Sequence, residues 1–92
     1  MKTPDEEIKQ ARNADKILND PVFKEAVEGI EKSLIDRMKQ VPMADMTTQH
    51  ELILTLQLLG KLKQSLHTMI ETGKMAEIQK ESITSKLKRA MR

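Results

Sequence analysis

The sequence predicts an all-α protein built on a long antiparallel helical hairpin. Strand-forming residues are scarce, because Phe23 is the single aromatic residue, whereas the better helix formers Leu, Ile, Met, Ala, Glu, Lys and Gln dominate. Three glycines and three prolines leave few breaks, which favours long helices. Two apolar stripes with helical spacing lie on either side of one predicted turn. With 92 residues, the chain is expected to form a single helical domain.

The first predicted helix is short and covers residues 4–18. Thr3 can cap its start, Pro4 suits the first helical position, and Glu6 stands where the second residue of a capping box belongs. Its apolar stripe is narrow and contains Ile8, Ala11 and Leu18. A helix of this kind needs a surface to lie on.

The second predicted helix covers residues 21–41 and forms one arm of the hairpin. Asp20 precedes a proline and therefore resists the α conformation, so it is expected to cap the helix with Pro21 at the first position. The helix should end before Pro42. Its apolar stripe advances in steps of three or four residues through Phe23, Val27, Ile30, Leu34, Met38 and Val41.

The third predicted helix covers residues 48–72 and forms the other arm, after a connection at residues 42–47. Either Asp45 or Thr48 is expected to cap it, and Thr48 with Glu51 also fits a capping box. Its apolar residues are Leu52, Ile53, Leu56, Leu59, Leu62, Leu66, Met69 and Ile70.

Gly73 is expected to end the third helix, because glycine favours the left-handed conformation of a helix C-terminal cap. Residues 74–92 then form a basic C-terminal helix, either separate or a bent continuation of the third. From Lys74 onward six basic residues accompany two acidic ones, so this segment has a charge of +4 and the remainder −2.

The hairpin register follows from the two stripes, because facing residues in antiparallel helices have a constant sum of residue numbers. Phe23 with Leu66, Val27 with Leu62, and Ile30 with Leu59 give 89, and Leu34 with Leu56 and Met38 with Leu52 give 90. Gly29 and Gly60 also sum to 89. They indicate either a close helix crossing or two tolerated glycines, each costing about 1 kcal/mol relative to alanine.

Candidate catalytic and metal-binding residues do not assemble into a site. His50 and His67 are about 25 Å apart along one helix at 1.5 Å per residue, and each is expected at the surface. The sequence has no cysteine, no glycine-rich phosphate loop and no carboxylate cluster with metal-ligand spacing. We therefore expect no enzymatic activity, no cofactor and no metal. No apolar run approaches the ~20 residues of a membrane span, so no membrane contact is expected.

The four cations near the C-terminus are the main electrostatic feature. Lys86, Lys88, Arg89 and Arg92 are candidate contacts for nucleic acid or for an acidic partner. The alternative is a solvated helix end, because cations suit the C-terminal pole of a helix dipole. DNA is the less favoured partner, since no aromatic residue accompanies these cations for stacking.

Self-association is predicted from Leu54 and Leu58, one turn apart on the third helix. One partner helix cannot cover them together with Leu52, Leu56 and Leu59, and large apolar patches usually mark contact sites. We therefore expect a homo-oligomer. The alternative is a monomeric three-helix bundle in which Ile8, Ala11 and Leu18 cover that face.

Three stretches of the chain resemble a group of small tailed-bacteriophage proteins. They are residues 11–14, residues 20–26 and residues 70–76, so that the resemblance spans about two thirds of the chain. The resemblance implies a setting near particle assembly and DNA packaging, in the host cytoplasm or the virion. It implies no settled activity and no site residue.

The leading hypothesis is a non-enzymatic phage protein that acts by helix-mediated assembly, as a minor virion component or a morphogenesis factor. Other phage structural proteins or host proteins are then its further partners. A small DNA-binding packaging or regulatory subunit using the basic C-terminal helix is the alternative. An inhibitor of a host protein is a third hypothesis.

Overall fold

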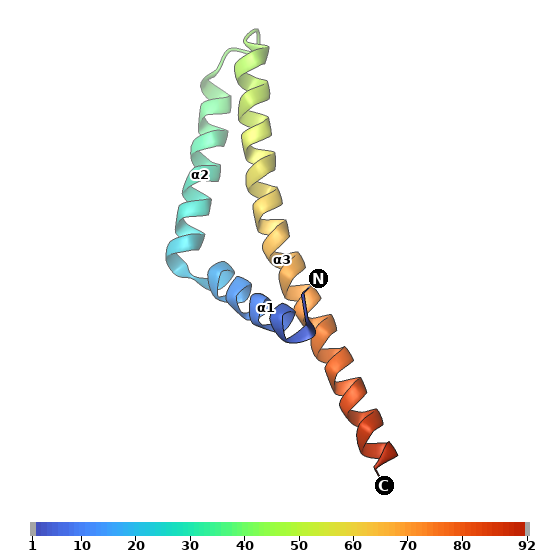
Figure 1. Cartoon of the computed structure of the whole chain (residues 1–92). Helices are drawn as coiled ribbons and strands as arrows, with labels where there is room; N and C mark the ends of the chain where they lie inside the picture. The colour runs from blue at the N-terminus through green and yellow to red at the C-terminus, as the bar shows by residue number, and fades with distance from the viewer. Residues whose placement is uncertain (1, 92) are drawn as a thin grey trace. The chain divides into compact units, whose positions relative to one another are not determined.

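The computed structural model describes residues 2–91, which form three helices joined by short connections (Figure 1). These are α1 (Pro4–Asn19), α2 (Pro21–Gln40) and α3 (Met46–Ala90), and the described part of the chain contains no strand. The all-α prediction is therefore confirmed. The chain divides into two compact units, which we call the hairpin unit (Leu18–Gln64) and the crossing unit (the described residues up to Ile17 and from Ser65 onward). The long helix α3 contributes a segment to each.

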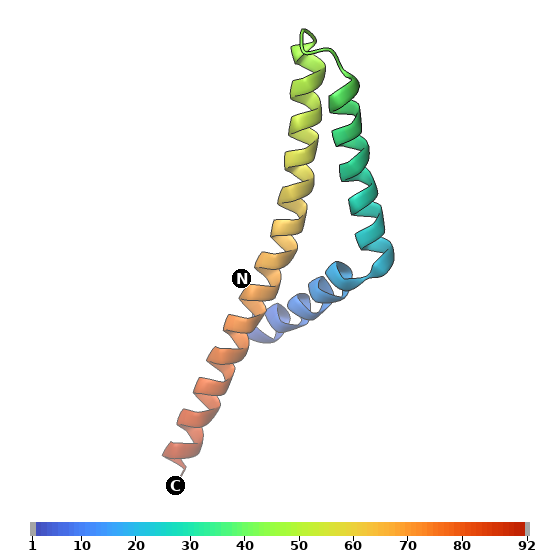
Figure 2. The same ribbon diagram turned by 180° about the vertical axis from the view of Figure 1, so that it is seen from behind.

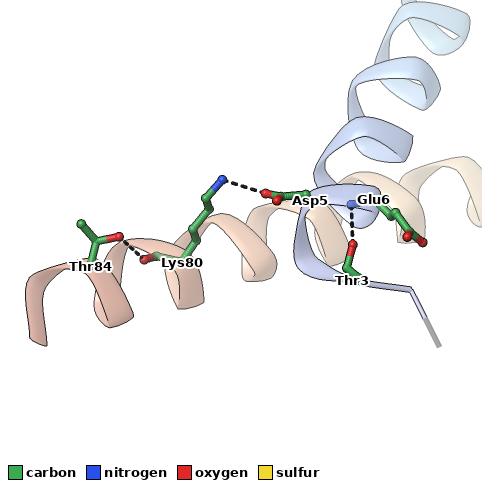
Figure 3. Close-up of polar contacts among 5 residues, drawn as sticks. All are labelled: Thr3, Asp5, Glu6, Lys80 and Thr84. Atoms are coloured by element: carbon green, nitrogen blue, oxygen red, sulfur yellow. Dashed lines mark hydrogen bonds and ion pairs between the residues drawn. The ribbon is translucent and has the colours of Figure 1, made fainter. Parts of the chain in front are cut away.

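Side-chain caps start α1 and α2 where the sequence predicts them. The Thr3 hydroxyl accepts a hydrogen bond of 3.2 Å from the backbone N–H of Glu6 (Figure 3). The Asp20 carboxylate accepts bonds of 2.8 and 3.0 Å from the backbone N–H groups of Val22 and Phe23. Such caps satisfy donors that the first turn of a helix leaves without an intrahelical partner.

The cap of α3 is Asp45, so the helix begins two residues earlier than predicted, at Met46. The Asp45 carboxylate accepts a bond of 3.2 Å from the backbone N–H of Thr48. Hydrogen bonds from the Thr48 side chain and backbone lower the pKa of Asp45, because they stabilise its ionised form.

In the hairpin unit, α2 and the first half of α3 lie side by side and antiparallel in both views (Figures 1 and 2). Val27 and Leu52 are buried in this unit. The half-buried apolar side chains are Leu18, Phe23, Leu34, Met38, Val41, Leu56 and Leu59. At the turn, the Gln49 side-chain amide donates to the carbonyl oxygens of Met38 and Val41, at 2.9 and 3.1 Å. Gln49 thus ties the end of α2 to the start of α3.

The inward side of α2 differs from the predicted stripe at Ile30. Near the turn, Gln49 bonds the carbonyl groups of Met38 and Val41, pairs whose residue numbers sum to 87 and 90. Ile30, however, is 49% exposed, and the prediction that it is buried against Leu59 is wrong. Glu31 is half-buried in its place and forms an ion pair with Lys63. In this part of α2, the residue that faces α3 is therefore Glu31, one position after the Ile30 that the apolar stripe predicts.

Gly73 does not end a helix, which corrects a second prediction. The helix α3 continues through it to Ala90, and no glycine among the described residues has a positive φ. The basic segment is therefore part of α3 and not a separate helix. A β-carbon built on Gly73 would lie 2.2 Å from the Ala11 β-carbon and 3.1 Å from the Glu7 carbonyl oxygen. Gly73 is needed because α1 crosses α3 there at very short range.

Candidate interaction surfaces

The exposed leucines of α3 form one stripe in the hairpin unit. Leu54, Leu58 and Leu62 follow one another at intervals of four residues, so they share one side of the helix. Their exposed fractions are 44%, 64% and 49%. Leu62 was predicted to be covered by Val27 and is instead half-exposed. The alternative bundle placed Ala11 on this face, whereas Ala11 lies against Gly73 within the crossing unit. We call these three residues the leucine stripe.

Gly29 and Gly60 do not form a close crossing. No atom would come within 4 Å of a β-carbon on either glycine, so of the two alternatives the close crossing is wrong. Gly29 lies instead in an open hollow of about 610 Å³ on α2. We call it the glycine hollow, and it is lined by Glu25, Ala26, Gly29, Ile30, Ser33, Leu34 and Arg37.

The glycine hollow and the leucine stripe belong to the same edge of the hairpin. Ile30 precedes the inward Glu31 by one residue, and Leu62 precedes the inward Lys63 in the same way. One residue turns an α-helix by about 100°. In two antiparallel helices that face each other, this rotation carries both side chains toward the same edge. That edge therefore presents Leu62, with Leu58 one turn before it, next to the glycine hollow of α2, while Leu54 lies farther round α3.

In the crossing unit, α1 packs on α3 through small residues. Ala14 and Ala76 are 2% and 1% exposed, and Ala11 faces Gly73. The Asp5 carboxylate also forms an ion pair of 2.7 Å with the Lys80 ammonium group (Figure 3). Sequence reasoning assigned the close crossing to the wrong glycines. The spacing of Ala11 and Ala14, matched by that of Gly73 and Ala76, was the signal that could have located it.

Beyond this crossing, α3 carries exposed apolar and basic side chains together. Ile83, Leu87 and Met91 are 58%, 58% and 86% exposed. Among the four predicted cationic contacts, Lys86, Lys88 and Arg89 are all exposed, and Arg92 lies outside the described residues. The cations of this helix end thus alternate with unburied apolar side chains.

Both histidines, His50 and His67, are exposed. Within residues 2–91 no three His, Cys, Asp or Glu side chains are placed to share a metal ion. A hollow of about 650 Å³ in the crossing unit carries charges of both signs, with lining residues that include Asp5, Arg12, Glu77, Lys80, Glu81 and Lys88. Mixed charges of this kind favour no simple anion or cation.

No protein-family model matches the chain, and neither a curated protein nor a solved structure matches it. No helix among residues 2–91 combines the length and the apolar character that crossing a membrane requires.

Proposed function

We propose that this protein is non-enzymatic and acts by helix-mediated assembly, beginning with association of two copies through the hairpin unit. The observation that carries the proposal is the exposed leucine stripe of Leu54, Leu58 and Leu62 beside the glycine hollow. Apolar side chains that gather on one exposed face mark contact sites in soluble proteins.

The two features suit a symmetric contact between identical chains. In a dimer with twofold symmetry the same patch is used by both subunits, so the patch must be complementary to itself. One edge of the hairpin offers both a ridge, centred on Leu58, and a hollow, opened by Gly29. Two copies related by a twofold axis would each place the ridge in the hollow of the other. Small residues in the hollow let the helices approach closely.

The resemblance to small tailed-bacteriophage proteins suggests where such an assembly operates. We place the protein in phage particle morphogenesis or in the virion, with other phage or host proteins as additional partners. Quantitative mass spectrometry of purified virions tests this setting. A fixed copy number per particle would support a virion component, and detection only in infected-cell extracts would support a morphogenesis factor.

Light scattering of the purified chain tests the self-association. The wild-type mass at micromolar concentration should be at least twice the 10.5 kDa of one chain. The variant Leu58→Lys should lower it to that of one chain, because it places a charge in the apolar contact. Gln57→Lys is the matched control: it adds the same charge at the next position, away from the stripe, and should keep the wild-type mass.

Two results would contradict the proposal. One is a wild-type chain that stays monomeric. The other is a Leu58→Lys variant that keeps the wild-type mass while circular dichroism shows an intact helical fold.

A further inference from the structure

The apolar seam of α3 in the crossing unit continues beyond the part that α1 covers. Its positions alternate in steps of three and four residues, the pattern of a helix that packs along another helix. They are Leu66, Met69, Gly73, Ala76, Lys80, Ile83, Leu87 and Ala90. The first four are buried or half-buried, and Lys80 pairs with Asp5, the second residue of α1. From Ile83 onward every described position is exposed.

This uncovered part is strongly basic. From Glu81 to the C-terminus the sequence has one acidic and four basic residues, a net charge of +3. Lys86 and Lys88 are the immediate neighbours of Leu87. Because each residue turns the helix by about 100°, they project to either side of the seam at Leu87. A helix lying on the seam would therefore have a cation along each flank.

We propose that Ile83 and Leu87, flanked by Lys86 and Lys88, dock an acidic amphipathic helix of another protein. Charge complementarity selects this occupant. A second copy of the same segment would set a charge of +3 against +3, which disfavours self-pairing. This surface lies outside the hairpin unit, and the inference does not depend on the proposed self-association.

The chain itself shows how such a helix would bind. The first turn of α1 is acidic, with Asp5, Glu6 and Glu7, and its next apolar residue, Ile8, is buried. The Asp5 carboxylate reaches Lys80, the seam position just before Ile83. A partner helix that continues along the seam needs the same two properties, an apolar stripe and flanking carboxylates.

Duplex DNA is a poorer match for this segment. Contacts with phosphates require cations that converge on one face. Lys86 and Arg89, three residues apart, share one side of the helix, but Lys88 points to another side, so the three described cations do not all converge. Ile83 and Leu87, each 58% exposed, would have no role against a phosphate backbone.

Fluorescence anisotropy with the full chain tests the docking surface. The probe is a labelled helical peptide of three heptads with Leu at the a and d positions and Glu at the e and g positions. We expect saturable binding that weakens at least tenfold for Ile83→Ser combined with Leu87→Ser. Each of Lys86→Gln and Lys88→Gln should weaken it by about two- to fivefold, as for other exposed ion pairs. A peptide with Lys at e and g should not bind measurably.

Ile78→Ser is the matched control, because Ile78 is on the same helix and 59% exposed but lies off the seam. It should bind the acidic peptide like the wild type. Equal loss for Ile78→Ser and Ile83→Ser would overturn the proposal, since the contact would then not be the seam. Tight, salt-dependent binding of a labelled DNA duplex without binding of the peptide would overturn it in favour of nucleic acid. A fall in the mass of the free protein on changing Ile83 and Leu87 would show a self-contact instead.

Discussion

Replacing Gly73 by alanine should destabilise the protein, whereas the same change at Gly60 should stabilise it. Alanine is favoured over glycine inside a helix by about 1 kcal/mol. At Gly60 no atom lies within 4 Å of the new β-carbon, so this gain should appear almost in full. Both glycines belong to α3, which makes Gly60→Ala the matched control.

At Gly73 the added β-carbon would meet the Ala11 β-carbon at 2.2 Å and the Glu7 carbonyl oxygen at 3.1 Å. Neither neighbour is a flexible side-chain end, so α1 must move away from α3. Overpacking of this kind typically costs about 1–3 kcal/mol. After subtracting the gain in helix propensity, Gly73→Ala should lower the free energy of unfolding by up to about 2 kcal/mol.

A double-mutant cycle in urea separates the steric effect from helix propensity. Ala11→Gly removes the nearest atom, so that the closest remaining neighbours are the Glu7 carbonyl oxygen at 3.1 Å and the Ala11 α-carbon at 3.6 Å. Combined with Gly73→Ala, it should therefore show a favourable coupling of about 1–3 kcal/mol. All samples need one protein concentration, because the proposed self-association would link stability to concentration. If Gly73→Ala stabilised the chain as Gly60→Ala does, with zero coupling, the close crossing would be refuted.

Three further predictions concern the hairpin unit. Leu52→Ala should lower the free energy of unfolding in urea by about 2–5 kcal/mol, as for buried leucines. Ile30→Ala should lower it clearly less, because Ile30 is 49% exposed. Equal losses for the two variants would contradict the observed burial. Gln49→Leu should cost about 1–2 kcal/mol by removing two hydrogen bonds at the end of α2, and an unchanged midpoint would show that they contribute nothing. The pKa of Asp45 is lowered in the folded chain, so its ionised carboxylate should stabilise the protein fully at neutral pH. This stabilisation should decrease as the pH falls through the carboxyl range. The stability difference between the wild type and Asp45→Ala should therefore shrink on acidification. A difference that stays constant with pH would contradict the role of the ionised cap.

The sequence predicts the starts of the helices well, because a helix start depends on the chemistry of a few neighbouring residues. Thr3, Asp20 and Pro21 determine helix starts through a few backbone groups, and all three act as predicted. The stripes likewise predict the antiparallel pairing of α2 with α3. They do not predict that Glu31 replaces Ile30 at the inward position, where it pairs with Lys63, because the stripe is read from apolar residues alone.

The role of Gly73 could not be decided from the sequence, because the lack of a β-carbon suits two different structures. A missing β-carbon permits the left-handed cap of a helix end and also permits a close helix crossing. Only the position of α1 decides between them, and here Ala11 lies against Gly73 while α3 continues. The same ambiguity explains why Gly29 and Gly60 were assigned to a crossing that does not form. The sequence does not determine where α1 docks, because the apolar stripe of α1 is too weak to select one position on α3.

The most direct test of the assembly proposed for the hairpin unit is the distance between two copies, measured by spin labels at one position per chain. The sequence has no cysteine, so Glu51→Cys, one turn before the leucine stripe, and Gln57→Cys, on another side of α3, each give one label. We predict a narrow distance distribution between labels at residue 51 that disappears when unlabelled chain is added in excess. Labels at residue 57 should lie farther apart. The absence of any intermolecular coupling at residue 51, or a shorter distance at residue 57, would contradict assembly through the leucine stripe.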